Sequence, residues 1–360
     1  MTGTNAAPNV RPGRSTRREP DRAAGVAMNI ASRYGLVLIL LLSVLVFGTL
    51  SPSTFLTAGN VGSIASTHAI TLILALAVLP ALLVGQFDFS VTGTFGVANA
   101  IVAYLVLVQG ASVYLAIVVA SAAGALIGIV NGLAVVRFGV NSLIATLGTG
   151  TILAGCANGI AASGTIVARE QLVDGQRVTF GFPDWFLSLG QGRVLGVGTP
   201  FLIALAAVVL MWFVLDRTAT GRRLVATGGN VTAARLSGVD TDRATFGSFV
   251  AGGVVAALAG VIVTAQLGSG QTNIAASFLL PAYAGAYLGA TTIRPGRVNA
   301  WGTFVGVYLV GVCVAGLQQL GVSAWVQDVF NGAALIVAVG ASGQLARLAR
   351  RGRIGPRRPD

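Results

Sequence analysis

The sequence predicts an all-α polytopic membrane protein with about ten transmembrane helices. Of its 360 residues, 54% are hydrophobic and only 9% are charged, whereas a soluble globular protein carries about 25% charged residues. The apolar residues stand in long runs that a water-soluble core could not bury, so we expect them to lie in a lipid bilayer. About ten helices of roughly 20 residues would use about 200 residues, which suits both the length and the apolar share.

The apolar runs divide the chain into a membrane domain and two tails. The first run, Tyr34 to Leu50, competes with a signal peptide. Because the preceding segment is long and no small-residue cleavage site follows Leu50, we expect an uncleaved anchor. Further runs lie near residues 61–84, 91–108, 113–136, 143–162, 201–215, 244–264, 278–293, 300–317 and 324–341. We expect a transmembrane domain over residues 34–341, a disordered, arginine-rich cytoplasmic tail over residues 1–33 and a basic cytoplasmic tail over residues 342–360.

The charges predict the orientation in the membrane. All 23 basic residues are arginines, and the formal net charge is +12. With the N-terminus in the cytoplasm, all but three of the arginines fall in cytoplasmic segments, and Arg169, Arg177 and Arg193 share one outer loop. This distribution obeys the positive-inside rule, so we expect both termini in the cytoplasm. It explains the basic excess without a nucleic-acid partner and also predicts attraction to anionic membrane lipid.

The residue types exclude several kinds of enzyme. The chain has no lysine, and both a nucleotide-binding P-loop and a Schiff-base enzyme need one. An intramembrane hydrolase needs a clustered nucleophile and base or a metal constellation. The chain has one histidine and no acid pair at catalytic spacing, so it offers neither a nucleophile–base cluster nor a metal site. We expect no catalytic residue, metal site or ATPase site in this chain, so any ATP hydrolysis belongs to a partner.

Two loops are longer than simple connectors. The outer loop, residues 163–199, has alternating stretches followed by the aromatic pair Trp185 and Phe186. We expect a short hairpin there and an amphipathic interfacial segment with an aromatic anchor. The second long loop, residues 216–243, lies on the inner side.

The inner loop carries the signals of a short helix with defined ends. Gly228 and Gly229 break the chain, Asn230 can cap a helix N-terminus, and Gly238 can supply a left-handed C-terminal residue. The two helical turns over residues 231–237 are too short to be stable alone in water. We therefore expect this helix to dock against another protein; the alternative is a capped helix that lies on the lipid headgroups.

An acidic residue lies at the junction of the second and third runs, in the stretch Gly85-Gln86-Phe87-Asp88-Phe89-Ser90-Val91-Thr92-Gly93. A carboxylate beside a buried apolar run is costly and therefore indicates a function. Asp88 and Ser90 either cap the next helix at its N-terminus or contribute to gating or substrate contact, and these roles are compatible.

Together with three later stretches, this junction resembles the permease subunits of ribose-type ABC importers. In that family the junction reads roughly Gly-Gly-Ile-Asp-Leu-Ser-Val-Gly. Here Gln86 replaces a glycine, and Phe87 and Phe89 replace aliphatic residues. The later stretches are Asn131-Gly132-Leu133 to Thr146-Leu147-Gly148-Thr149, then Thr220-Gly221-Arg222-Arg223 to Val239, and Trp301-Gly302-Thr303. The resemblance covers about Ser51 to Ala341 in the family's order. The chain departs from the family again at Asn141-Ser142, where prolines are common, and over residues 291–297.

The resemblance implies a type II importer fold in a bacterial inner (cell) membrane. Ten helices per subunit would surround a central pathway with a second permease copy, identical or a paralogue. Two cytoplasmic ATPase subunits would carry ATP and Mg, and an extracytoplasmic sugar-binding protein would deliver substrate to the outer face. The residues that would couple to the ATPase are Gly221, Arg222, Arg223, Gly229, Asn230, Ala234, Arg235, Leu236 and Gly238.

Polar residues inside the spans are candidates for the pathway, because a sugar needs hydroxyl and amide groups that bind it only weakly. We expect Asn99 and Thr146 to line the pathway. Asp88, Ser90 and Thr149 are further candidates for the pathway or its gating. For each such residue the alternative is an interhelical hydrogen bond that stabilises the bundle.

Two transport mechanisms fit these observations. The first is an ATP-driven importer subunit for a ribose-like or related monosaccharide. The alternative is a secondary transporter of a small polar solute that is driven by an ion gradient. Such carriers usually place several acids or a histidine relay in their spans, whereas this chain has only His68, Asp88 and Asp328 near them.

Overall fold

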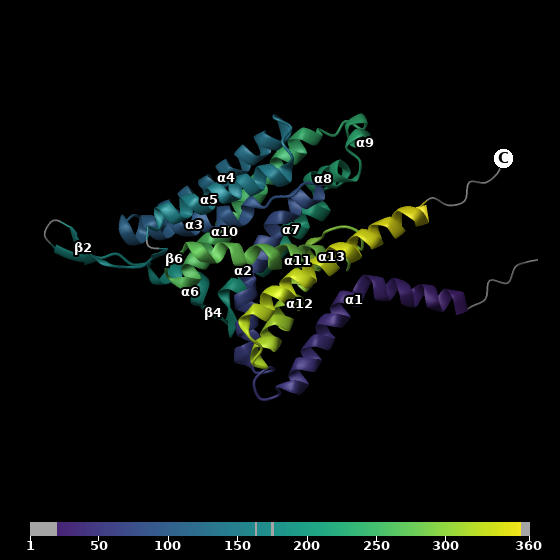
Figure 1. Ribbon diagram of the computed structural model, residues 1–360, viewed down its shortest axis with the longest axis horizontal. Helices are drawn as coiled ribbons and strands as arrows, with labels where there is room; N and C mark the ends of the chain where they lie inside the picture. Colours follow the sequence, from purple (N-terminus) through teal and green to yellow (C-terminus); the bar gives the residue numbers. More distant parts are fainter. Residues whose placement is uncertain (1–19, 163, 174–175, 354–360) are drawn as a thin grey trace, which may run out of the picture.

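The computed structural model describes residues 20–162, 164–173 and 176–353 (Figure 1). The described part is dominated by helices, as predicted. The N-terminal half contains α1 (Pro20–Leu50), α2 (Ala58–Leu83), α3 (Ser90–Ala103) with a π-helical continuation η1 (Tyr104–Val108), α4 (Val113–Val136) and α5 (Ser142–Ile160). After the outer loop follow α7 (Thr199–Arg217), α8 (Ala219–Gly229), α9 (Val231–Leu236), α10 (Thr241–Leu267), η2 (Thr272–Phe278), α11 (Leu279–Gly289), α12 (Ala300–Gln319) and α13 (Ala324–Arg353).

Most of the predicted spans coincide with these helices. Within the described residues, seven helices are long and apolar enough to cross a membrane: α2, α3 with η1, α4, α5, α7, α10 and α12. Residues 34–50 and 325–340 form shorter apolar helical stretches. The run expected over residues 278–293 corresponds to α11, which begins at Leu279 but ends at Gly289, before the expected end of the run. The 3-10 segment η2 precedes α11.

The two expected tails are partly helical. Helix α1 begins at Pro20, inside the segment assigned to a disordered tail, and α13 continues to Arg353, inside the segment assigned to the basic tail. Residues 1–19 and 354–360 lie outside the described residues.

Helix α2 forms the centre of the bundle. Residues 69–81 are all buried, as expected of a helix that is apolar on every side. Helices α7, α10, α11 and α12 pack around it.

Helices α4 and α10 cross at very short distance because of glycines. Gly124, Gly128 and Gly132 recur every fourth residue and therefore share one face of α4. A Cβ on Gly124 would lie 2.5 Å from the carbonyl oxygen of Gly253, and one on Gly128 would lie 2.5 Å from that of Phe249. The two backbones are in direct contact, which is a common use of small residues between membrane helices.

The outer loop contains a hairpin, as expected, and the expected interfacial segment is a helix, α6 (Asp184–Gln191). Strands β2 (Glu170–Val173) and β3 (Gln176–Thr179) pair antiparallel and project from the helices (Figure 1). Shorter antiparallel pairs join β1 (Thr165–Ile166) to β6 (Gly270–Gln271) and β4 (Arg193–Val194) to β5 (Val197–Gly198). In α6, Phe186 is buried and Trp185 stacks on Tyr114 with ring centroids 4.9 Å apart.

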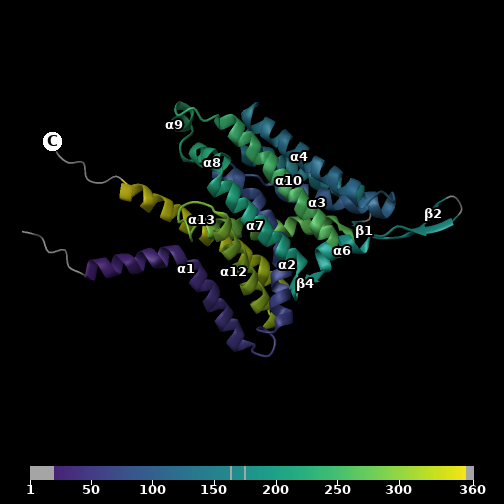
Figure 2. The same cartoon turned by 180° about the vertical axis from the view of Figure 1, so that it is seen from behind.

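Helices α8 and α9 lie at one end of the bundle, away from β4, as both views show (Figures 1 and 2). The antiparallel contact of α4 with α10 brings Arg137, at the end of α4, to the same end. The packing of Gly228 against Leu83 brings the end of α2 there as well.

Candidate functional site

The junction between α2 and α3 is a short non-helical segment held by its neighbours. Gly85 has a positive φ of 79°, which favours glycine and allows the chain to turn out of α2. Beyond it, the N–H of Phe87 donates to Ser142 Oγ (3.2 Å) and the N–H of Phe89 donates to Thr146 Oγ1 (3.0 Å). The side chains of Ser142 and Thr146 in α5 therefore accept hydrogen bonds from backbone N–H groups that have no partner within a helix.

Tyr283 of α11 holds the same segment from the opposite side. Its hydroxyl donates to the carbonyl oxygen of Asp88 (2.9 Å) and accepts from the N–H of Asp88 (3.1 Å). The ring of Tyr283 stacks on Phe89 with centroids 4.9 Å apart, and Phe89 stacks on Phe87 at 6.0 Å. The two phenylalanines that depart from the family pattern thus belong to one aromatic stack with Tyr283.

Asp88 belongs to a buried polar network. Its Oδ1 accepts from the N–H of Ser90 (3.0 Å) and from Ser90 Oγ (2.6 Å) at the start of α3. The N-cap residue of this helix is Phe89, which makes no side-chain capping bond, so the expected cap by Asp88 and Ser90 is present only as the Asp88 bond to Ser90. Asn131 Nδ2 donates to Ser90 Oγ (2.7 Å), and Thr149 Oγ1 lies 2.7 Å from Asn131 Oδ1. The network joins α3, α4 and α5, and Asp88 is only 2% exposed.

Asn99 and Thr146, the two preferred lining residues, are both fully buried. Asn99 Nδ2 donates to Thr264 Oγ1 (2.8 Å) and to the carbonyl of Ser269 (3.3 Å), while its Oδ1 accepts from the N–H of Gln271 (2.7 Å). Thr146 Oγ1 is occupied by the backbone bonds at the junction and at Ser142. Both side chains make contacts between elements, as the alternative role predicts, and neither faces open space in this conformation.

The inner-loop helix has the predicted ends. In α9, Asn230 Oδ1 accepts from the N–H of Ala233 (3.0 Å), and Gly238 has a positive φ of 80°. The preceding helix α8, which the sequence did not indicate, is capped by Thr218.

Helix α9 is anchored on one side and exposed on the other. Arg235 Nη2 lies 2.6 Å from Asp242 Oδ1, Arg235 Nε donates to Thr241 Oγ1 (2.7 Å), and Ala234 is buried. The side chain of Leu236 is 86% exposed. The helix thus presents an apolar side chain to the outside from a fixed backbone.

The glycines of this region have different roles. A Cβ on Gly221 would clash with the carbonyl of Leu215, and one on Gly228 would clash with that of Leu83, so both sites require glycine. A Cβ on Gly229 would meet nothing within 4 Å. Arg222 and Arg223 are exposed.

The loop between α11 and α12 also contacts this end of the bundle, and sequence reasoning missed its contacts. Arg294 Nη1 forms an ion pair with Asp216 Oδ1 at the end of α7. Asn299 Nδ2 lies near the carbonyls of Gly289 (3.1 Å), Thr292 (3.2 Å) and Arg297 (3.2 Å), and Asn299 Oδ1 accepts from the N–H of Gly302 (2.8 Å). Burial and the neighbouring Arg294 lower the pKa of Arg297, and Asp216 opposes this shift. An Asn directly before an apolar run is a helix-capping signal that could have found Asn299.

Residues 60–339 match the family model described as the branched-chain amino acid transport system / permease component. The chain belongs to this family. The permease is 33% identical over 261 residues to the ribose import permease protein RbsC of Haemophilus influenzae, covering 72% of this chain and 77% of the relative. It is 30% identical over 308 residues to the D-allose transport system permease protein AlsC of Escherichia coli, covering 85% and 90%.

A third relative, the autoinducer 2 import system permease protein LsrD of Yersinia enterocolitica, is 32% identical over 319 residues, covering 87% of the permease and 93% of the relative. No solved structure matches the permease. The matched family and the helices of the described part agree on a polytopic, all-α membrane protein.

Proposed function

We propose that the permease is the transmembrane subunit of an ATP-driven importer that moves a monosaccharide or related sugar into the bacterial cytoplasm. Three relatives that cover most of the chain are named for the import or transport of ribose, D-allose and autoinducer 2. The family description names branched-chain amino acids, but these relatives favour a small, hydroxyl-rich solute.

The exposed helix α9 carries the proposal that a separate ATPase drives transport. Six residues are too few for a helix that is stable alone in water, yet α9 has both caps and a hydrogen-bonded anchor at Arg235. Leu236 is 86% exposed on it, and burial of this apolar side chain against a partner would be favourable. We assign α8 and α9 to the ATPase contact, with ATP and Mg bound by the ATPase subunits.

The arginine distribution supports the orientation. The end that carries α8 and α9 also carries Arg137, Arg294 and Arg297, which the positive-inside rule places in the cytoplasm. In this arrangement both termini are cytoplasmic, and the outer loop with the β2–β3 hairpin faces an extracytoplasmic sugar-binding protein. A second permease copy would complete the pathway.

The α2–α3 junction then lies at the cytoplasmic end, beside the ATPase contact. We assign Asp88, Ser90 and Thr149 to gating, because one hydrogen-bonded network links them across three helices. Asn99 and Thr146 support the helices around the pathway through the bonds described above.

The decisive experiment measures assembly with candidate ATPase subunits of ABC importers. Leu236→Asp is expected to weaken co-purification about 30-fold, since a central apolar contact contributes about 2 kcal/mol to such an interface. Leu195→Asp is the matched control, because Leu195 is fully exposed in the outer β4–β5 turn. Unchanged assembly of the Leu236 variant would remove α9 from the ATPase contact.

A second arm separates the two transport mechanisms. Proteoliposomes that contain the assembled complex should take up labelled sugar with ATP inside and without an ion gradient. Uptake that requires a proton or sodium gradient and does not depend on ATP would favour the secondary transporter.

A further inference from the structure

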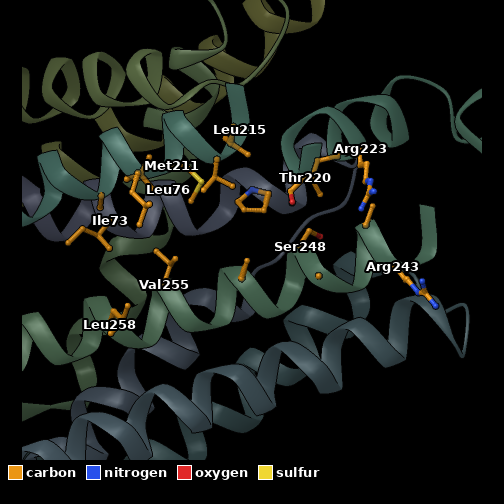
Figure 3. Close-up of a pocket in the computed structure, with 18 of the residues that line it drawn as sticks. Ile73, Leu76, Met211, Leu215, Thr220, Arg223, Arg243, Ser248, Val255 and Leu258 are labelled. Carbon is orange, nitrogen blue, oxygen red and sulfur yellow. The ribbon is translucent and has the colours of Figure 1, made fainter. Parts of the chain in front are cut away.

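A groove lies between α7 and α10, on the part of the bundle that α2 closes from behind. Both helices pack on α2 but make little direct contact with one another, so α2 forms the floor of the groove. The cavity has a volume of about 680 Å³, which is within the range of ligand sites of about 300–1,000 Å³. Figure 3 shows its lining side chains.

The groove is apolar along most of its length. Ile73 and Leu76 come from α2, Met211 from α7, and Val255 and Leu258 from α10. Leu258 is 40% exposed, and Leu210 at the rim is 64% exposed. A sugar pathway needs hydroxyl and amide groups along its wall, so this wall fits a hydrocarbon chain and does not fit a sugar.

The chemistry changes at the end of the groove beside α8 and α9. Thr220, Arg223, Asp240, Arg243 and Ser248 line this end, and the labelled arginines lie at the opposite end of the view from Ile73 and Leu258 (Figure 3). Asp240 Oδ2 lies 3.1 Å from Arg243 Nε, so this carboxylate offsets one of the two positive charges. Arg223 is exposed and forms none of the ion pairs found among the described residues.

We propose that this groove binds one anionic glycerophospholipid. One acyl chain lies between α7 and α10, and the phosphate lies at Arg223 and Arg243. The apolar wall, the excess positive charge and their order along the groove match the amphipathic structure of a phospholipid at a membrane surface. Binding of this lipid does not depend on the proposed transport function.

The test measures binding of defined lipids to the full-length permease in detergent, by native mass spectrometry. The probes are palmitoyl-oleoyl-phosphatidylglycerol and the zwitterionic palmitoyl-oleoyl-phosphatidylcholine, and inorganic phosphate is the competitor. One phosphatidylglycerol is expected to bind at least fivefold more tightly than phosphatidylcholine. Equal binding of the two lipids would overturn the proposal.

Two variants locate the site. Arg223→Ala should weaken phosphatidylglycerol binding about fivefold, since one arginine near a membrane surface contributes about 1 kcal/mol. Gly247→Leu should abolish binding of both lipids, because Gly247 lines the groove and a Cβ there meets nothing within 4 Å, which leaves room for the new side chain. Thermal unfolding of each variant shows that it is folded.

Arg137→Ala is the matched control. Arg137 is an exposed arginine at the same end of the bundle and does not line the groove, so its loss should leave lipid binding unchanged. Equal weakening by Arg137→Ala would indicate non-specific attraction and overturn the site. Displacement of the lipid by inorganic phosphate, with no effect of Gly247→Leu, would indicate a free-phosphate site and also overturn it. A second permease copy that occupies the groove and excludes lipid would also overturn the proposal.

Discussion

The crossing of α4 and α10 gives a prediction whose size follows from the structure. In Gly124→Ala, the new Cβ would lie 2.5 Å from the carbonyl oxygen of Gly253 and 2.6 Å from the Cβ of Ala257. Carbon atoms prefer separations of about 3.5–4.0 Å, so the helices must move apart by about 1 Å. Overpacking of this kind costs about 1–3 kcal/mol, and the better helix propensity of alanine returns about 1 kcal/mol at most.

We therefore expect Gly124→Ala to lower the free energy of unfolding by about 1–2 kcal/mol. The assay is SDS or thermal unfolding of the detergent-solubilised permease, followed by tryptophan fluorescence. The matched control is Gly62→Ala in α2, where a Cβ meets nothing within 4 Å, and its stability should be unchanged or slightly higher.

The double variant tests the mechanism more sharply. Gly128→Ala creates contacts of 2.5 Å with the Phe249 carbonyl and 2.6 Å with the Val250 Cα. Because one separation of the helices relieves both clashes, the double variant should lose less stability than the sum of the single losses. Additive losses, or a Gly124 variant as stable as the Gly62 control, would refute a rigid backbone contact.

Three further changes have defined outcomes. Asn299→Ala should lower the free energy of unfolding by about 1–3 kcal/mol, because buried backbone groups lose their partner; a thermal-unfolding midpoint equal to that of the parent would contradict this. Tyr283→Phe keeps the aromatic stack but removes both bonds to the Asp88 backbone, so amide hydrogen exchange at residues 85–90 should accelerate while exchange in α4 stays constant. Arg235→Ala should change stability by at most about 1 kcal/mol, since its ion pair with Asp242 is about 60% exposed on both sides; a larger loss in the same unfolding assay would show that α9 depends on this pair.

The features that could be predicted from the sequence are those that depend on residues close together along the chain. Asn230 and Gly238 define α9 through their own side chain and backbone freedom, and both are in place. The apolar runs match helices such as α2 and α10 because hydropathy acts along one segment at a time. The run at residues 278–293 matches the start of α11 at Leu279, but its end was wrong, because the helix stops at Gly289.

Contacts between distant segments could not be predicted in this way. Tyr283 meets Asp88 across 195 positions of the chain, and no local pattern pairs them. Asn99 shows the same limit, because its type and span position fit a lining residue and an interhelical bond equally well, and only the positions of Thr264 and Gln271 distinguish the two. The groove between α7 and α10 likewise depends on how both helices pack on α2.

The contact of α8 with α2 has a mechanical consequence. At Gly228 the two backbones touch, with Leu83 on the other side and no side chain between them to act as a spring. A displacement of α8 therefore presses directly on the end of α2, two residues before Gly85, as well as on α7 and α10, on which α8 also packs. Force applied at this surface therefore reaches the turn between α2 and α3 through a backbone contact, without passing through a side chain.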